Sequence, residues 1–150
     1  AEETRTDPIT VKGKLGDTLR LVGQSGYKKP SKVKVAVTVK RITGPFSGFN
    51  LDAGRKLIGI EVRVTNVGTA RFDDALPGGR LAVSGGESGK QTSLISTGKK
   101  SPCDNPSLKL APGQSKEVCI AYDIPKAGTP ETFEFAVDSG YGDTGLWRLR

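Results

Sequence analysis

Two cysteines are the residues of this chain best suited to covalent chemistry. Cys103 and Cys119 are the only cysteines, they lie 16 positions apart, and no Cys-x-x-Cys motif is present. The chain has no histidine, which excludes a Ser-His-Asp triad, an imidazole general base and a His-ligated zinc site. A cysteine nucleophile would also need a basic partner, and none is placed to serve. The favoured interpretation is an intrachain disulfide, worth about 3 kcal/mol in the chain-entropy model, with two free thiols as the alternative.

A disulfide would place the protein in an oxidising compartment. The chain contains no methionine and begins with the polar run AEETRTDP, as expected of a mature chain after signal removal or of a trimmed chain. No stretch approaches the ~20 apolar residues of a membrane-spanning helix. We therefore predict an extracellular or cell-surface protein, whose membrane contact would come only through a lipid anchor upstream of Ala1.

Carboxylates offer weaker candidates for chemistry. Asp138 and Asp143 flank a Gly-rich turn, which could supply calcium with oxygen ligands if Asp123 lay near, but Asp and Gly are also ordinary turn formers. Asp73 and Asp74 are adjacent, so in a strand they would point to opposite faces and make a poor glycosidase pair. We favour the structural interpretation for all of them and predict no enzyme, no metal and no cofactor.

Positive charge is concentrated near the N-terminus. Residues 11–41 hold nine Lys and Arg against one Asp, although the whole chain has a net charge of only +7. Such asymmetry is typical of proteins with an anionic partner, while a solvated face that aids solubility is the alternative. The candidate binding lysines, three on a loop and two on the outward side of the next strand, are Lys28, Lys29, Lys32, Lys34 and Lys40.

Aromatic side chains suggest a second binding surface. Phe46 and Phe49 lie among turn formers in residues 43–55, where exposed aromatics could contact a partner. The alternative is that they cover the core as a lid. Trp147, beside Leu146 and Leu149, is interpreted as a core residue.

Strands must position these residues, because apolar and polar residues alternate with a period of two. The pattern is clearest in residues 33–40, 58–65, 118–124 and 133–138, and Gly, Pro, Asn and Asp turns separate the segments. No window shows a convincing helical period. About seven to nine short strands with one apolar face each predict an all-β, antiparallel β-sandwich, with an oligonucleotide-binding type of barrel as the competitor. We expect residues 1–10 to be a flexible lead-in and residues 11–150 to be one domain.

Several of these segments resemble one protein family. Leu57–Gly68 (LIGIEVRVTNVG) is similar to the long central strand and Asn-x-Gly turn of the DUF4352 family, which is related to the mycobacterial MPT63-type secreted antigens. The resemblance continues where Cys103 and Cys119 bracket Leu110–Ser115 (LAPGQS) and where Asp123–Pro125 (DIP) ends the next strand, a pattern that looks actinobacterial. It covers roughly residues 11–149. It implies an immunoglobulin-like sandwich and an exported protein or lipoprotein, without an established activity.

These observations predict a non-catalytic secreted or cell-surface module that binds other molecules. We expect its partner to be a protein or a cell-envelope macromolecule rather than nucleic acid, and the module to be a monomer or weak dimer. The alternative is a polyanion-binding protein that holds wall polymer, anionic lipid or nucleic acid through residues 11–41.

Overall fold

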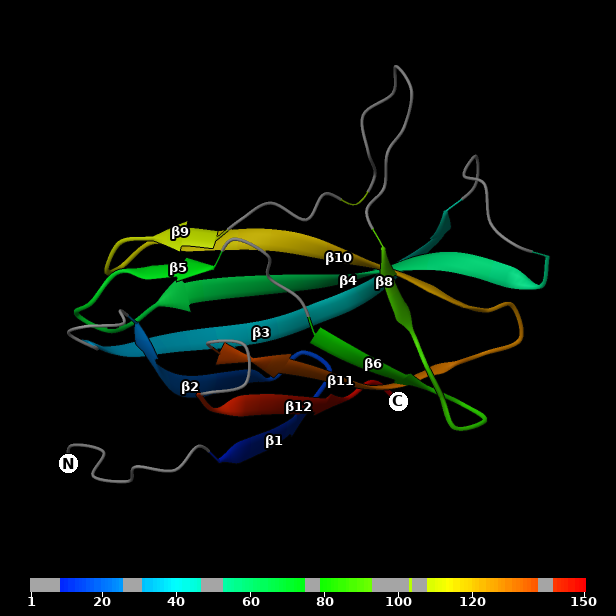
Figure 1. Ribbon diagram of the computed structural model, residues 1–150, viewed down its shortest axis with the longest axis horizontal. Coiled ribbons are helices and arrows are strands. Elements are labelled where there is room, and N and C mark those ends of the chain that lie inside the picture. The colour runs from blue at the N-terminus through cyan, green and yellow to red at the C-terminus, as the bar shows by residue number, and fades with distance from the viewer. Residues whose placement is uncertain are drawn as a thin grey trace, which may run out of the picture.

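Two five-stranded sheets pack face to face in the computed structural model, which describes residues 9–25, 31–46, 53–74, 79–92, 103, 108–137 and 142–150 (Figure 1). Sheet 1 has the order β1-β12-β11-β6-β7, sheet 2 has the order β2-β3-β4-β10-β8, and β5 pairs with β9. The strands are β1 (Thr10–Lys14), β2 (Thr18–Ser25), β3 (Ser31–Phe46), β4 (Arg55–Asn66), β5 (Phe72–Asp74), β6 (Gly79–Val83), β7 (Glu87–Ser88), β8 (Lys90–Thr92), β9 (Leu108–Leu110), β10 (Ser115–Pro125), β11 (Pro130–Ala136) and β12 (Thr144–Arg148).

The predicted β-sandwich is confirmed. The described residues form twelve strands rather than seven to nine, because β5, β7, β8 and β9 have only two or three residues each, too few for an alternating pattern to show. The part of the chain that the structure describes contains no helix long and apolar enough to cross a membrane.

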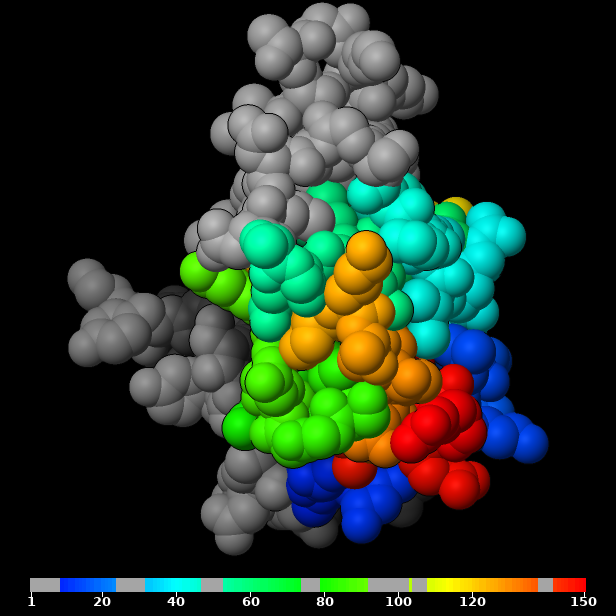
Figure 2. All heavy atoms as spheres, turned by 90° about the vertical axis from the view of Figure 1, so that its right-hand side faces the viewer, coloured from blue at the N-terminus to red at the C-terminus, as the bar shows by residue number. Residues whose placement is uncertain are grey.

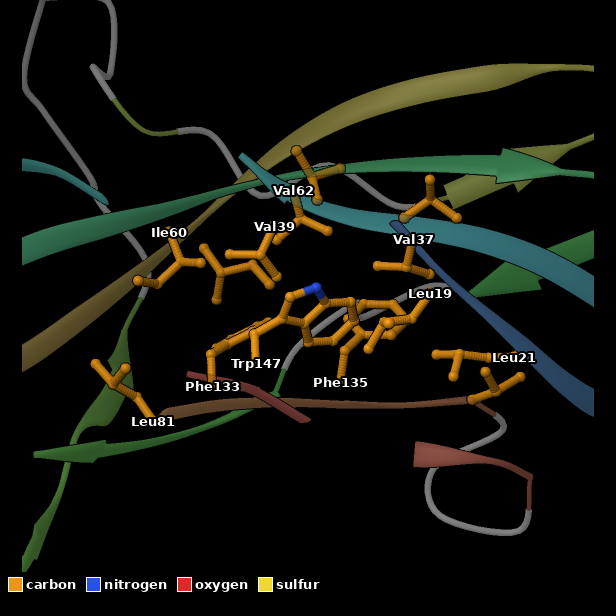
Figure 3. Packing of buried hydrophobic residues seen from close by; sticks show 14 of the residues in the cluster. Leu19, Leu21, Val37, Val39, Ile60, Val62, Leu81, Phe133, Phe135 and Trp147 are labelled. Carbon is orange, nitrogen blue, oxygen red and sulfur yellow. The ribbon is translucent and has the colours of Figure 1, made fainter. Parts of the chain in front are cut away.

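The core lies between the inner faces of the two sheets (Figure 3). As the alternation predicts, β3 sends Val33, Val35, Val37 and Val39 inward, and all four are fully buried. The central strands of the opposite sheet contribute rings: Phe133, Phe135 and Trp147 are also fully buried. The other core residues from the long strands are Ile58, Ile60, Val62, Val64, Val118, Ile120, Tyr122 and Ile124.

Trp147 is a core residue, as the sequence predicts. Its ring lies 6.3 Å from that of Phe133, centroid to centroid, and its indole Nε1 donates a 2.9 Å hydrogen bond to the carbonyl oxygen of Asp17. The bond satisfies the one polar atom of the side chain, so the ring is buried without leaving a donor unpaired. A Cβ on Gly145 would approach the ring within 2.5 Å, so this strand position needs glycine.

One strand pair departs from the antiparallel pattern. β1 runs parallel to β12, with Thr10 opposite Thr144 and Lys14 opposite Arg148. Every other pair among the described strands is antiparallel. The parallel pairing brings the first and the last described strands side by side at one edge of sheet 1 (Figure 1).

Candidate functional site

The predicted basic surface divides into parts in the structure. Lys28, Lys29 and Phe49 lie outside the described residues. The sequence predicts Lys32 on a loop, but it lies on β3, where it precedes the inward-facing Val33 and is exposed. Lys34, between Val33 and Val35, is half-buried and shares the outer face of sheet 2 with Lys32.

Lys40 belongs to a different environment. The register between β3 and β4 shifts between Val39 and Arg41, so Lys40 lies in a β-bulge and both it and Arg41 are exposed. The Lys40 Nζ lies 2.6 Å from Glu117 Oε1 on β10, and Arg41 pairs with Glu61 on β4. The positive charge of Lys40 is therefore largely balanced within the outer face of sheet 2.

These pairs shift the pKa values of their members. The hydrogen bond from Lys40, together with its charge, lowers the pKa of Glu117 below its ordinary value, and Arg63 and Arg41 add smaller attractions. The hydrogen bond and charge of Glu61 raise the pKa of Arg41. Because these side chains are exposed to solvent, the pairs contribute little stability and mainly fix charge positions on the sheet.

Replacing Lys40 with Met is expected to raise the pKa of Glu117 toward its ordinary value. In the native chain the pair favours ionised Glu117, so its contribution is present above the unfolded-state pKa and is lost as the pH falls through the lowered native pKa. An NMR titration of the Glu117 carboxyl carbon measures this shift. Lys109→Met, on the exposed side of β9, is the control and should leave Glu117 unchanged. An unaltered Glu117 titration in Lys40→Met would show that the pair does not form.

Phe46 is half-buried at the end of β3, opposite Leu57 of β4. The register is irregular between Thr43 and Phe46, and the Gly44–Pro45 peptide bond in that stretch is cis. Of the two phenylalanines predicted as a binding surface, Phe46 therefore lies at one end of sheet 2, and its side chain is partly exposed to solvent.

The predicted disulfide is confirmed. Cys103 and Cys119 form a bridge with a Cα–Cα distance of 5.0 Å, and the described residues contain no free cysteine. Cys119 lies on the outer side of β10, so the bridge fastens Cys103 to the outer face of sheet 2. Gly59, on the adjacent strand β4, allows this: a Cβ there would meet Cys119 Sγ at 2.6 Å and Cys103 Sγ at 2.9 Å.

The buried carboxylate of Asp143 has a structural role. It is 1% exposed, and its two oxygens accept hydrogen bonds from the backbone N–H groups of Ile9 and Val22, each at 3.0 Å. Its own N–H donates to the Val22 carbonyl oxygen at 2.8 Å. Asp143 thus joins the start of β1, the outer edge of β2 and the start of β12.

The other carboxylates considered from the sequence are also paired. Asp123 accepts a 2.7 Å hydrogen bond from Arg55 Nε, and Asp73 accepts one of 2.9 Å from Arg71. Asp138 and the side chain of Asp74 lie outside the described part of the structure. Within the described ranges, no three His, Cys, Asp or Glu side chains are close enough to hold a metal ion.

A cluster of cations formed by β1 and β12 is not evident from the sequence. Lys14, Arg148 and Arg150 line a cavity of about 320 Å³ together with Leu15 and Leu149, which we call the basic groove. In Figure 2, red atoms from the C-terminal end and blue atoms from N-terminal residues share this end of the molecule. Arg148 and Arg150 are more than 130 positions from Lys14 in the chain, so only the parallel pairing of β1 with β12 reveals the cluster.

Backbone contacts hold the groove in place. The N–H of Leu15 donates to the carbonyl oxygen of Arg148 at 2.7 Å, and the N–H of Leu149 donates to that of Glu131 at 2.8 Å. The Glu131 carboxylate accepts a 2.7 Å hydrogen bond from Arg150. Two segments from opposite ends of the chain are therefore fixed to each other and to β11.

Comparisons with known proteins support the fold alone. No family model and no curated protein matches the sequence. Among solved structures, the YjhA protein from Bacillus subtilis is similar with a TM-score of 0.54 and 15% identity, over 93% of this chain and 99% of that one. An uncharacterized β-sandwich protein from Clostridium difficile 630 matches with a TM-score of 0.49 and 12% identity, over 100% and 99% of the two chains. A conserved hypothetical protein from Bacillus anthracis matches with a TM-score of 0.42 and 17% identity, over 85% and 96%.

Proposed function

We propose that this protein is a non-catalytic, exported binding module. The disulfide supports an oxidising compartment, because thiol pairs stay reduced in most cytosolic proteins. A sandwich of two sheets is a rigid support whose edges, faces and connecting segments are free to contact a partner. The absence of histidine from the sequence leaves no imidazole for acid–base chemistry.

An anionic cell-envelope polymer is the partner that the described surface favours. The edge strands β1 and β2 and the start of β3 carry exposed cations on one flank of the sandwich: Lys12, Lys14, Arg20 and Lys32. Asp17 is the only acid in residues 11–41, and its carboxylate accepts a hydrogen bond from the backbone N–H of Lys14. This excess of positive charge on one flank carries the proposal, because it attracts a polyanion over a distance of about one Debye length, ~10 Å at 0.1 M salt.

Binding to purified anionic wall polymer at low and moderate salt tests this function. We expect the wild-type chain to bind at low salt and to lose affinity steeply as salt rises. A variant with Arg20→Glu and Lys32→Glu should bind at least about tenfold more weakly, since each reversed charge replaces an attraction by a repulsion. A Lys90→Glu, Lys109→Glu variant, changed at exposed positions of β8 and β9, controls for net charge.

Two outcomes would contradict the polyanion proposal. Binding that is insensitive to salt and to the Arg20→Glu, Lys32→Glu substitutions would move the contact to the segment around Phe46. No binding at either salt concentration would leave the positive flank as a solvated face. Circular dichroism of each variant establishes that the sandwich is intact before binding is compared.

A further inference from the structure

The basic groove has the features of a site for one highly charged group. Three cationic side chains from two distant parts of the chain, Lys14, Arg148 and Arg150, line the same concavity. Its volume of about 320 Å³ lies at the lower end of the ~300–1,000 Å³ usual for small-molecule sites. The hydrogen bonds from Leu15 to Arg148 and from Leu149 to Glu131 fix the backbone beneath these side chains.

The charges in the groove are only partly compensated. Arg150 pairs with Glu131, whereas the structure pairs neither the Lys14 ammonium nor the Arg148 guanidinium with a carboxylate of the described residues. Lys12 extends the positive charge along β1, where it lies on the same exposed side as Lys14. Lysines on an edge strand also discourage pairing with another chain, and that role would explain Lys12 and Lys14. It does not explain two arginines that come to the same cavity from the other end of the sequence.

Resting on the function proposed above, we propose that the basic groove binds a phosphate group of an anionic polymer. The planar guanidinium of arginine matches two oxygens of one phosphate, and lysine adds a mobile point charge. A phosphate linked into a polymer carries one negative charge, as a carboxylate does, but its four oxygens are arranged tetrahedrally, so cations around one concavity can reach it from different sides. The exposed side chain of Leu15 lines the same groove and contacts the carbon atoms next to the phosphate, while Leu149 belongs to the core beneath it.

The surrounding charges give the polymer a direction. On the other side of Glu131 lies a second groove of about 280 Å³ over β6, β7 and β11, whose acidic lining residues are Glu87, Glu131 and Glu134. That surface offers a polyanion no net attraction, because Arg80, Arg55 beside Glu87 and Arg150 beside Glu131 balance its carboxylates. The positive side leads from the basic groove along β1 past Lys12. A phosphate polymer therefore follows the β1 edge of sheet 1 rather than crossing β11.

Titration of the full chain with sodium tripolyphosphate, followed by NMR, tests the site directly. We expect the amide signals of Leu15 and Leu149 to move with a single binding curve, and those of β9 to stay in place. A Lys14→Glu, Arg148→Glu variant should bind at least about tenfold more weakly, because two attractive contacts become repulsive. The Lys90→Glu, Lys109→Glu variant makes the same change in net charge outside the groove and should bind within about twofold of wild type.

Parallel titrations separate the sources of the charge. Polyglutamate at equal charge concentration should bind more weakly than tripolyphosphate, and equal binding would overturn the assignment to phosphate. Equal weakening of tripolyphosphate binding in Lys14→Glu, Arg148→Glu and in Lys90→Glu, Lys109→Glu would show non-specific attraction. That result would also overturn the assignment of the site to the basic groove. Wall-polymer binding that is intact in Lys14→Glu, Arg148→Glu but lost in Arg20→Glu, Lys32→Glu would reject this site while the proposed function stands. Tripolyphosphate binding without wall-polymer binding would reject the proposed function, while the groove would stand as a phosphate site.

Discussion

Replacing Trp147 with Ala is expected to lower the free energy of unfolding by about 3–5 kcal/mol, the usual cost of removing a fully buried large ring. The side chain is 0% exposed, and it packs against Phe133 between the two sheets. Its removal leaves a cavity in the central layer and also deprives the Asp17 carbonyl oxygen of its indole donor. Urea unfolding followed by circular dichroism measures the change.

A Trp147→Phe variant separates the packing contribution from the hydrogen bond. Phenylalanine keeps most of the apolar contact and removes the donor, so we expect a loss of about 1–2 kcal/mol. An alanine variant that lost less than the phenylalanine variant would mean that the ring is not buried as the structure places it.

Removing the disulfide with Cys103→Ser and Cys119→Ser is expected to lower the free energy of unfolding by about 3 kcal/mol, since the bridge closes a 16-position loop. The structure adds a second effect at Gly59. Gly59→Ala should cost about 1–3 kcal/mol in the bridged protein, because its Cβ would collide with both sulfur atoms and with Thr43 Oγ1. Without the bridge, Cys103 is no longer held over β4, so the same substitution should cost less.

A double-mutant cycle measures this dependence. The four proteins are the wild type, Gly59→Ala, the two-serine variant and their combination, and the coupling is the difference between the two Gly59→Ala costs. Gly113→Ala, at an exposed turn with a φ of +86°, is a control whose cost should not depend on the bridge. Equal costs at Gly59 with and without the bridge would contradict the contact. Two free thiols in the unfolded, unreduced wild type would contradict the bridge itself.

The long strands could be predicted from the sequence because one physical rule governs them. Each valine of β3 that faces the opposite sheet alternates with a residue on the outer face, and burial of the inner face makes that alternation obligatory. The rule fails at Arg41, because a bulge puts both Lys40 and Arg41 on the exposed side. Alternation alone groups Lys40 with Lys34, although Lys40 lies within the bulge and pairs with Glu117.

The candidate site could be predicted only in part, because it depends on contacts between distant segments. The excess of cations in residues 11–41 is visible in the sequence and includes Lys14. Its neighbours Arg148 and Arg150 look like ordinary terminal residues until the parallel register of β1 with β12 is known. A local pattern carries no information on which strand becomes the neighbour of an edge strand, so this half of the groove needs the tertiary structure.

The parallel pairing of β1 with β12 also determines how the fold responds to tension. A pull on the chain before Thr10, opposed by a pull after Arg148, slides the two strands past each other along their length. The hydrogen bonds across the five paired positions then stretch together, instead of opening one after another as in a peeled hairpin. Asp143 adds bonds to Ile9 and Val22 at the loaded end. A pull between the two ends of the described chain would thus load this ladder in shear, with all five paired positions sharing the force.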